Sequence, residues 1–119
     1  KRSDLYQIMK ESWACLYPNT FWESFCLTCL ETQAAGVPMI TTLQGALSTT
    51  LDRAGNILLF GDPSAKAYQD EFVHEAVSLL TDRERTLALS RRCAEYIAAL
   101  PCDWRDIAGE WESLLVSLV

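Results

Sequence analysis

Residues 13–42, WACLYPNTFWESFCLTCLETQAAGVPMITT, contain the pattern of a strand, a helix and a second strand. The apolar run Trp13–Tyr17 is stopped by a proline and an asparagine, which is typical of a short buried strand. Leu27–Ala35 has helical character, and Gly36 follows it as a C-cap. Val37–Thr42 is the second predicted strand, with a proline near its beginning, where a missing N–H group is tolerated. Because strands joined through a helix run parallel, this segment predicts a parallel sheet.

The segments on either side extend the same pattern. Leu5–Glu11 has the apolar spacing of a helix face, Leu47–Leu51 is predicted as a short helix, and Asn56–Phe60 as a third strand. Alternating strands and helices predict an α/β fold, in which a Rossmann-like parallel sheet is flanked by helices. Three strands are few for such a sheet, since both faces and both edges need cover, so further strands are expected before Lys1.

The last part of the chain is predicted to be helical. Asp62 is the expected N-cap of a helix with Pro63 at its first position. Thr81–Glu84 matches a capping box that restarts the helix after a bend, and Asp103 is the expected cap of a final helix. The apolar residues predicted to line the packed faces of these helices are Tyr68, Phe72, Val73, Ala76, Val77, Leu80, Leu87, Ala94, Ile97, Trp104, Ile107, Ala108, Trp111, Leu114, Leu115 and Leu118.

Composition limits the classes of function. The 119 residues suffice for one domain, and 50% hydrophobic with 22% charged residues is the balance of a globular protein. The net charge of −6 and the scattered basic residues argue against nucleic acid as a partner. The sequence contains no apolar run long enough to cross a membrane, and its start lacks the pattern of a signal peptide.

The cysteines allow two interpretations. An odd number, 5, at irregular spacing is a poor disulfide framework and favours a reducing cytoplasm. The spacing Cys26-x-x-Cys29 nevertheless leaves a redox role open, because such a pair after a strand and at a helix start is thioredoxin-like. A zinc site would need two more ligands, and no second pair supplies them. The other cysteines are Cys15, Cys93 and Cys102.

Glu23 lies in the predicted loop, Thr20–Cys26, and Glu31 lies about one turn into the helix that follows it. In a parallel sheet this loop lies at the carboxyl ends of the strands, where α/β proteins bind ligands. The helix N-terminus, around Cys26–Thr28, offers unpaired N–H groups and a positive dipole end suited to a pyrophosphate. Carboxylates on either side can accept hydrogen bonds from sugar hydroxyls. A sugar linked to a diphosphate therefore fits this arrangement.

The segment Tyr17–Glu31, continued by residues 34–42, resembles the Glu-x7-Glu signature of the retaining group 1 (family 4-like) glycosyltransferases. That family typically has a strand and Pro-Ser, then Glu-Gly-Phe-Gly-Leu, a helix with a second Glu, and Gly-x-Pro-Val-Ile. The similarity continues through Gly45, Ala54–Phe60 and Gly61–Pro63, and so covers essentially the whole chain. It implies that residues 1–119 are the C-terminal part of the donor-binding domain of a GT-B fold. An N-terminal acceptor-binding domain would precede them.

The resemblance also implies a reaction and a site. Such enzymes move a sugar from a nucleoside-diphosphate sugar to an acceptor with retention of configuration. Glu23 would be the catalytic residue, contacting hydroxyls of the donor sugar, and Glu31 would bind the ribose hydroxyls. Thr42 and Gly45 would lie near the site on a neighbouring loop. The diphosphate-binding loop would comprise Ser24, Phe25, Cys26 and Leu27.

The resemblance places further groups outside this chain. The basic residues that contact the diphosphate lie upstream in the family, as do the acceptor-binding groups, so this segment alone is expected to be inactive. It implies no metal, and no cofactor apart from the nucleotide-sugar substrate. The expected location is the cytoplasm or the cytoplasmic face of a membrane.

The chain departs from the family pattern at two places. Ser24 and Cys26 stand where glycine is frequent, and Leu47 and Thr49 replace the usual Pro-Glu pair. These differences leave open a second hypothesis, a non-catalytic glycosyltransferase-like interaction module that has kept the fold and lost the donor. A redox or metal protein built on the two closely spaced cysteines is the third.

Other conspicuous residues have simpler interpretations. His74 lies among acidic residues and is expected to be exposed on a helix rather than to act as a general base. Trp104 and Trp111 have helical spacing and are expected to pack, against the N-terminal domain, rather than to stack on sugars. Arg53 and Lys66 are interpreted as the only cations near the predicted site, and both are expected at the surface.

Overall fold

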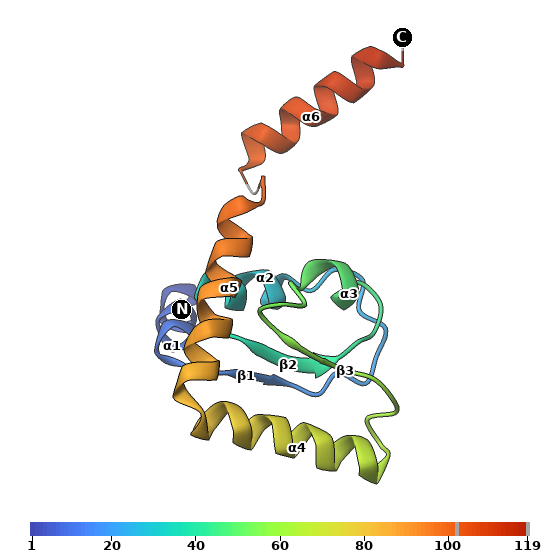
Figure 1. Cartoon of the computed structure of the whole chain (residues 1–119). Helices are drawn as coiled ribbons and strands as arrows, with labels where there is room; N and C mark the ends of the chain where they lie inside the picture. Colours follow the sequence, from blue (N-terminus) through green and yellow to red (C-terminus); the bar gives the residue numbers. More distant parts are fainter. Residues whose placement is uncertain (102, 119) are drawn as a thin grey trace.

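The computed structural model of the protein describes residues 1–101 and 103–118 (Figure 1). Helices and strands alternate along the first half, and helices follow in the second half. In chain order they are α1 (Arg2–Glu11), β1 (Cys15–Tyr17), α2 (Leu27–Ala34), β2 (Met39–Thr42), α3 (Leu47–Thr50), β3 (Ile57–Leu59), α4 (Lys66–Thr81), α5 (Arg83–Ala99) and α6 (Trp104–Ser117).

Three parallel strands form one sheet within the described residues, in the order β1-β2-β3. Leu16 lies opposite Ile40 in one pair of strands, and Ile40 lies opposite Ile57 in the other. All four residues of the central strand β2 are buried. The predicted α/β fold with a parallel sheet flanked by helices is therefore confirmed, and each of the three strands is two residues shorter than predicted because pairing stops where the loops diverge.

Helices cover both faces of the sheet. Helix α4 lies along one face, and α2 and α3 lie across the other, while α5 runs past one end of the sheet beside α2 (Figure 1). A core cluster between the sheet and α4 contains Ile40, Leu59, Tyr68, Ala76 and Leu79. A second cluster contains Cys29, Met39, Leu47 and Leu51. Burial on both faces explains why the sequence of β2 does not alternate between apolar and polar residues.

A buried amide network connects the second cluster to the ends of the elements around it. The side-chain amide of Gln33 donates to the carbonyl oxygens of Cys29 and Thr50 at 3.1 and 2.9 Å. Its carbonyl oxygen accepts from the Asn56 amide at 2.9 Å, and the Asn56 carbonyl oxygen accepts from the N–H of Met39 at 2.9 Å. Because Gln33 is wholly buried and hydrogen-bonded at both ends, it fixes α2 against α3 and β3.

Two predicted helix starts are wrong, although the helices exist. The N-cap of α4 is Ala65 rather than Asp62, whose carboxylate accepts from the N–H and the hydroxyl of Ser64 at 2.8 Å in a turn before the helix. The N-cap of α5 is Asp82, which accepts from the N–H of Arg85 at 2.9 Å. Thr81 instead ends α4, and its hydroxyl donates back to the Val77 carbonyl at 2.8 Å. The predicted bend is therefore one residue later than the capping-box pattern indicated.

Several apolar positions predicted to be buried are exposed. On α4, Val73, Val77 and Leu80 are each more than half exposed, whereas Tyr68 and Ala76 are buried. On α5 the buried residues are Thr86 and Cys93 rather than Ala94. These helices pack along a narrower stripe than the sequence predicted: within the described chain α4 contacts β2, β3 and α5, and α5 contacts α2 and α4.

Helix α6 extends away from the sheet (Figure 1). Asp103 caps it as predicted, accepting from the N–H of Arg105 at 2.8 Å. None of its residues, all of which are described, is buried, and Trp104 and Trp111 are 82% and 60% exposed. The predicted packing of these two tryptophans is therefore not made by the described part of this chain.

Candidate functional site

Two loops meet at the carboxyl end of the sheet. Gly45, which follows β2, has a φ of 57°, and a Cβ added there would lie 2.2 Å from the carbonyl oxygen of Glu23. The N–H of Ala46 donates to the same oxygen at 2.8 Å. Only glycine accommodates both the positive φ and this approach. The structure thus brings together two predicted site residues that are far apart in the sequence.

The Glu23 side chain is half-buried and held from both sides. The Tyr17 hydroxyl donates to Oε2 at 3.2 Å, and the N–H of Ser24 donates to Oε1 at 3.2 Å. Burial, with the neighbouring Cys26 and Glu23, raises the pKa of Tyr17 to about 12, so its hydroxyl stays protonated and able to donate. Tyr17 was not predicted as a site residue. The one signal for it is a phenol at the last position of a strand before the loop.

The predicted diphosphate-binding loop leads directly into α2. Ser24, Phe25 and Leu27 are exposed, and Cys26 is the N-cap with a φ of 65°. A cysteine therefore adopts the left-handed conformation at the position where the family often has glycine. The first turn of α2 begins beside the Glu23 backbone, so its N–H groups and positive dipole end lie next to that loop.

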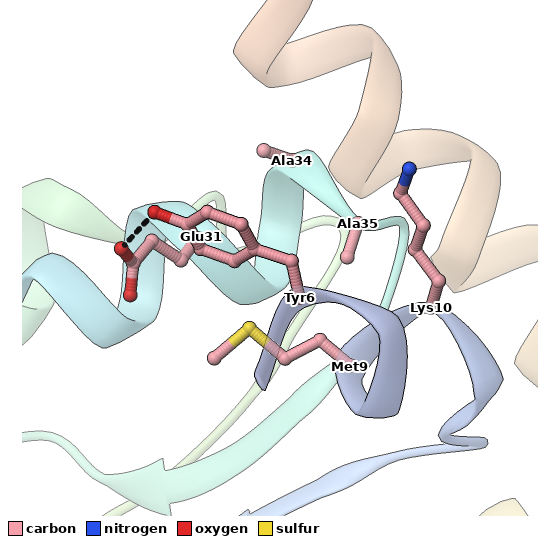
Figure 2. Close-up of a pocket in the computed structure, with 6 residues that line it drawn as sticks. All are labelled: Tyr6, Met9, Lys10, Glu31, Ala34 and Ala35. Carbon is pink, nitrogen blue, oxygen red and sulfur yellow. Dashed lines mark hydrogen bonds between the residues drawn. The ribbon is translucent and has the colours of Figure 1, made fainter. Parts of the chain in front are cut away.

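Glu31 lies one turn into α2, on the side that faces α1 (Figure 2). The Tyr6 hydroxyl donates to its Oε1 at 3.0 Å. A pocket of about 310 Å³ opens between the two helices; it is lined by Tyr6, Met9, Lys10, Glu31, Ala34 and Ala35 (Figure 2). This volume is at the lower end of the range of small-molecule sites. Neither Tyr6 nor Lys10 was predicted, because both belong to a helix that precedes the recognised motif.

The side chain of Thr42 is buried beneath the site. Its hydroxyl donates to the Asn19 carbonyl oxygen at 2.6 Å and hydrogen-bonds with the Tyr68 hydroxyl at 2.6 Å. Asn19 is itself buried, and its Oδ1 accepts from the N–H of Phe21 at 3.0 Å, whereas its Nδ2 has no hydrogen-bond partner among the described residues. Thr42 therefore fastens the loop after β1 to the sheet and to α4, and it is placed to support the site from below.

The paired cysteines lie at the same helix start. The Sγ atoms of Cys26 and Cys29 are 2.9 Å apart, and Cys29 Sγ is 3.5 Å from the Met39 sulfur. Cys15 belongs to the same cluster, and burial raises the pKa of both Cys15 and Cys29. All of these cysteines are free thiols. Cys102 lies outside the described residues.

The remaining candidates take no part in this arrangement. His74 is exposed on α4, as predicted, and Arg53 and Lys66 are exposed, with Lys66 paired to Asp70. Within residues 1–101 and 103–118, no group of three or more His, Cys, Asp or Glu side chains is arranged to hold a metal ion. In the same ranges, no helix combines the length and the apolar character needed to cross a bilayer.

Comparison with known protein families gives a match over most of the chain. Residues 1–97, from the first helix to the last turns of α5, match the family model described as glycosyl transferases group 1. A search of curated proteins found no match to the chain. The matched range contains the whole sheet, both loops at its carboxyl end, and Glu23 and Glu31. The chain therefore belongs to the group 1 glycosyltransferases, whose domain serves glycosyl transfer from a sugar donor to an acceptor.

Proposed function

We propose that this chain is the donor-binding part of a retaining glycosyltransferase whose donor is a nucleoside-diphosphate sugar. The main support is the contact between Gly45 and the Glu23 backbone, which holds a carboxylate beside the N-terminus of α2. A negatively charged diphosphate is stabilised at such a helix start, and an adjacent carboxylate accepts hydrogen bonds from sugar hydroxyls. The transferred sugar would lie on the Glu23 side of this helix, and the nucleoside would lie on the Glu31 side.

On the sugar side, Glu23 is the proposed catalytic residue. Its carboxylate, oriented by Tyr17 and by the N–H of Ser24, would bind hydroxyls of the transferred sugar and align the anomeric carbon. The N–H groups of Phe25, Cys26 and Leu27 would stabilise the charge that develops on the leaving diphosphate. These N–H groups are already in place and need no reorganisation while the bond to the sugar breaks. They therefore stabilise mainly the transition state.

On the nucleotide side, Glu31 is proposed to accept hydrogen bonds from the ribose hydroxyls. The pocket of about 310 Å³ beside it would receive the rest of the nucleoside, with Met9 and Ala35 as apolar walls and Lys10 at the rim. The Tyr6 hydroxyl now donates to the oxygen that the ribose would use. Donor binding would therefore exchange a tyrosine hydrogen bond for one from the sugar.

Thr42 and Gly45 have supporting roles in this proposal. Thr42 binds the carbonyl oxygen of Asn19 from below, and Gly45 packs against the Glu23 backbone from the neighbouring loop. Both residues therefore fix the position of the Glu23 loop relative to the sheet. The free thiols of the chain fit a reducing cytoplasm, which we propose as the location, either in solution or at the cytoplasmic face of a membrane.

Ligand-observed NMR of the intact protein with UDP-, GDP- and ADP-sugars tests the donor site. One nucleotide class is expected to bind, and Glu31→Gln is expected to weaken it by about tenfold or more, because a charge-assisted hydrogen bond contributes about 1.5–3 kcal/mol. Glu71→Gln, at an exposed position of α4, is the matched control and should leave binding unchanged. If no nucleotide sugar binds, the non-catalytic interaction module becomes the better hypothesis.

Product stereochemistry tests the reaction. Once the donor and an acceptor are known, NMR of the product should show that the anomeric configuration of the transferred sugar is retained. An inverted product would contradict the retaining mechanism while leaving the donor site intact. Glu23→Gln should lower kcat more than it raises the donor KM, since the proposed contact acts at the reacting sugar.

A further inference from the structure

Two thiols at the start of α2 are already close enough to react with each other. The Sγ atoms of Cys26 and Cys29 are 2.9 Å apart, and a disulfide bond is about 2.05 Å long, so the sulfurs need to approach by only about 0.9 Å. The N–H of Cys29 donates to the Cys26 carbonyl at 3.1 Å, which holds the two backbones in one helical turn. Bond formation therefore requires no rearrangement of the helix.

The two sulfurs differ in access. Cys26 is partly exposed on the loop, whereas Cys29 is wholly buried against Met39. Burial raises the pKa of Cys29, which keeps its thiol protonated. An oxidant from solvent would therefore meet Cys26 first, and Cys29 would complete the bond. Cys93 is buried elsewhere, with its Sγ 3.1 Å from the Gly55 carbonyl oxygen, and takes no part in this pair.

The backbone at Cys26 gives this bond a consequence. Cys26 is the one non-glycine residue with a positive φ among the described residues. That conformation costs a residue with a Cβ roughly 1–2 kcal/mol, so the reduced loop also populates other conformations. A ligand that needs one conformation binds more weakly by the fraction of the time the loop spends in it. A covalent bond to Cys29 would remove the alternatives.

We propose that Cys26 and Cys29 form a reversible disulfide that locks the diphosphate-binding loop in its left-handed, binding-competent conformation. The locking half of the proposal rests on the donor site proposed above, whereas the disulfide does not. Oxidation thus strengthens donor binding, and reduction relaxes the loop. The oxidant is a low-molecular-weight disulfide, with glutathione disulfide as the representative.

The thiol–disulfide exchange with glutathione disulfide proceeds in two steps. The Cys26 thiolate attacks one sulfur of glutathione disulfide, breaks its S–S bond and releases one glutathione thiolate. The Cys29 sulfur then attacks the Cys26 sulfur, forms the protein disulfide and displaces the second glutathione, and the Cys29 proton passes to that departing thiolate. Two electrons leave the protein, and one glutathione disulfide becomes two glutathiones. Excess glutathione reverses both steps.

Chemical mapping tests the disulfide directly. The intact protein is equilibrated with glutathione and glutathione disulfide, the free thiols are alkylated, and the protein is cleaved with chymotrypsin. Cleavage after Leu27 separates Cys26 from Cys29, so mass spectrometry should detect a linked pair of peptides under oxidising conditions. Cys15→Ala, which removes the third sulfur of the cluster, should leave that pair unchanged, and Cys26→Ser should abolish it. A bond to Cys15, or a stable glutathione adduct on Cys26 alone, would overturn the proposal.

Binding of UDP, GDP and ADP to the two redox forms tests the locking. The oxidised protein is expected to bind its preferred nucleoside diphosphate about 3- to 10-fold more tightly than the reduced protein. Cys26→Gly, which cannot form the disulfide, should bind with the same affinity under both redox conditions. Equal or weaker binding by the oxidised wild type would refute the locking. If neither form binds any of the three, the donor assignment fails, while the mapped disulfide stands.

Discussion

The contact of Gly45 with the Glu23 backbone leaves no room for a side chain. In Gly45→Ala the new Cβ would lie 2.2 Å from the Glu23 carbonyl oxygen and would occupy a φ of 57°. We expect the free energy of unfolding to fall by about 2–4 kcal/mol, through overpacking and backbone strain together, as measured by urea denaturation. Gly109→Ala is the control, because nothing lies within 4 Å of its added Cβ. Equal effects of the two substitutions would show that the two loops do not touch.

Position 26 should reverse the usual order of alanine and glycine. Both Cys26→Ala and Cys26→Gly remove the sulfur, but only alanine keeps a Cβ in the left-handed conformation. The glycine variant is therefore expected to be more stable than the alanine variant by about 1 kcal/mol in urea denaturation under reducing conditions. At an ordinary extended or helical position the difference has the opposite sign. An alanine variant that is the more stable of the two would contradict the φ of 65°.

Residue by residue, the motif predicts which backbone segments meet but not which side chains support them. The contact between the Glu23 loop and Gly45 follows from parallel strands ending at one edge. The hydrogen bonds from Tyr6 to Glu31 and from Tyr17 to Glu23 depend on rotamers and on where α1 packs, which spacing does not reveal. The same holds for Thr42: the motif predicts that it lies near the site, but not that its side chain is buried beneath it.

Among the elements, strands and helices could be predicted wherever apolar spacing and a stop signal agree. The predicted starts of two helices were wrong. Thr81–Glu84 matches a capping box, but Asp82 is the cap because its carboxylate reaches the N–H of Arg85 while Thr81 completes the last turn of α4. Asp62 likewise accepts hydrogen bonds from Ser64, four residues before α4 begins at Lys66. In both cases local hydrogen bonds, which the sequence pattern does not reveal, set the helix start.

Helix α5 should therefore depend on Asp82 rather than on Thr81. Asp82→Ala is expected to lower the free energy of unfolding by about 1 kcal/mol, because it leaves a helix N–H without its side-chain acceptor. Thr81→Ala should cost less than about 0.5 kcal/mol, since its hydroxyl only bonds back to the Val77 carbonyl on an exposed turn. Thermal unfolding followed by circular dichroism measures both. If Thr81→Ala destabilises the protein more than Asp82→Ala does, Thr81 rather than Asp82 is the cap of α5.

For the molecule as a whole, burial holds protons on two groups that would otherwise lose them at high pH. Burial raises the pKa of Cys93 to about 12 from 9.0 and of Tyr17 to about 12 from 10.0. The folded protein therefore keeps these protons over a range in which the unfolded chain has already released them. Their contribution to stability should be complete below about pH 9 and lost as the pH rises towards about 12.

Urea denaturation at several pH values between 8 and 11, chosen to span the start of this loss, measures the effect. Cys93→Ser removes the titrating thiol while keeping a small donor near the Gly55 carbonyl. Above pH 9 its stability is expected to fall less steeply than that of the wild type, by up to about 1.4 kcal/mol per pH unit. The slope, rather than the absolute stability, is the readout, because serine is more polar than cysteine. Parallel curves would exclude the buried thiol as a cause.

Strand β2 lies in the centre of the sheet, with a strand on each edge and helices over both faces. In deuterated water this central position should be measurable as slow exchange of the amide hydrogens. The amide hydrogens of β2 should exchange last, because solvent reaches them only when the whole sheet opens. Those of α6, which buries none of its side chains, should exchange first among the helices. The loop that presents Glu23 begins at an edge strand and is held to the centre through Gly45, so a bound ligand would slow exchange on both loops at once.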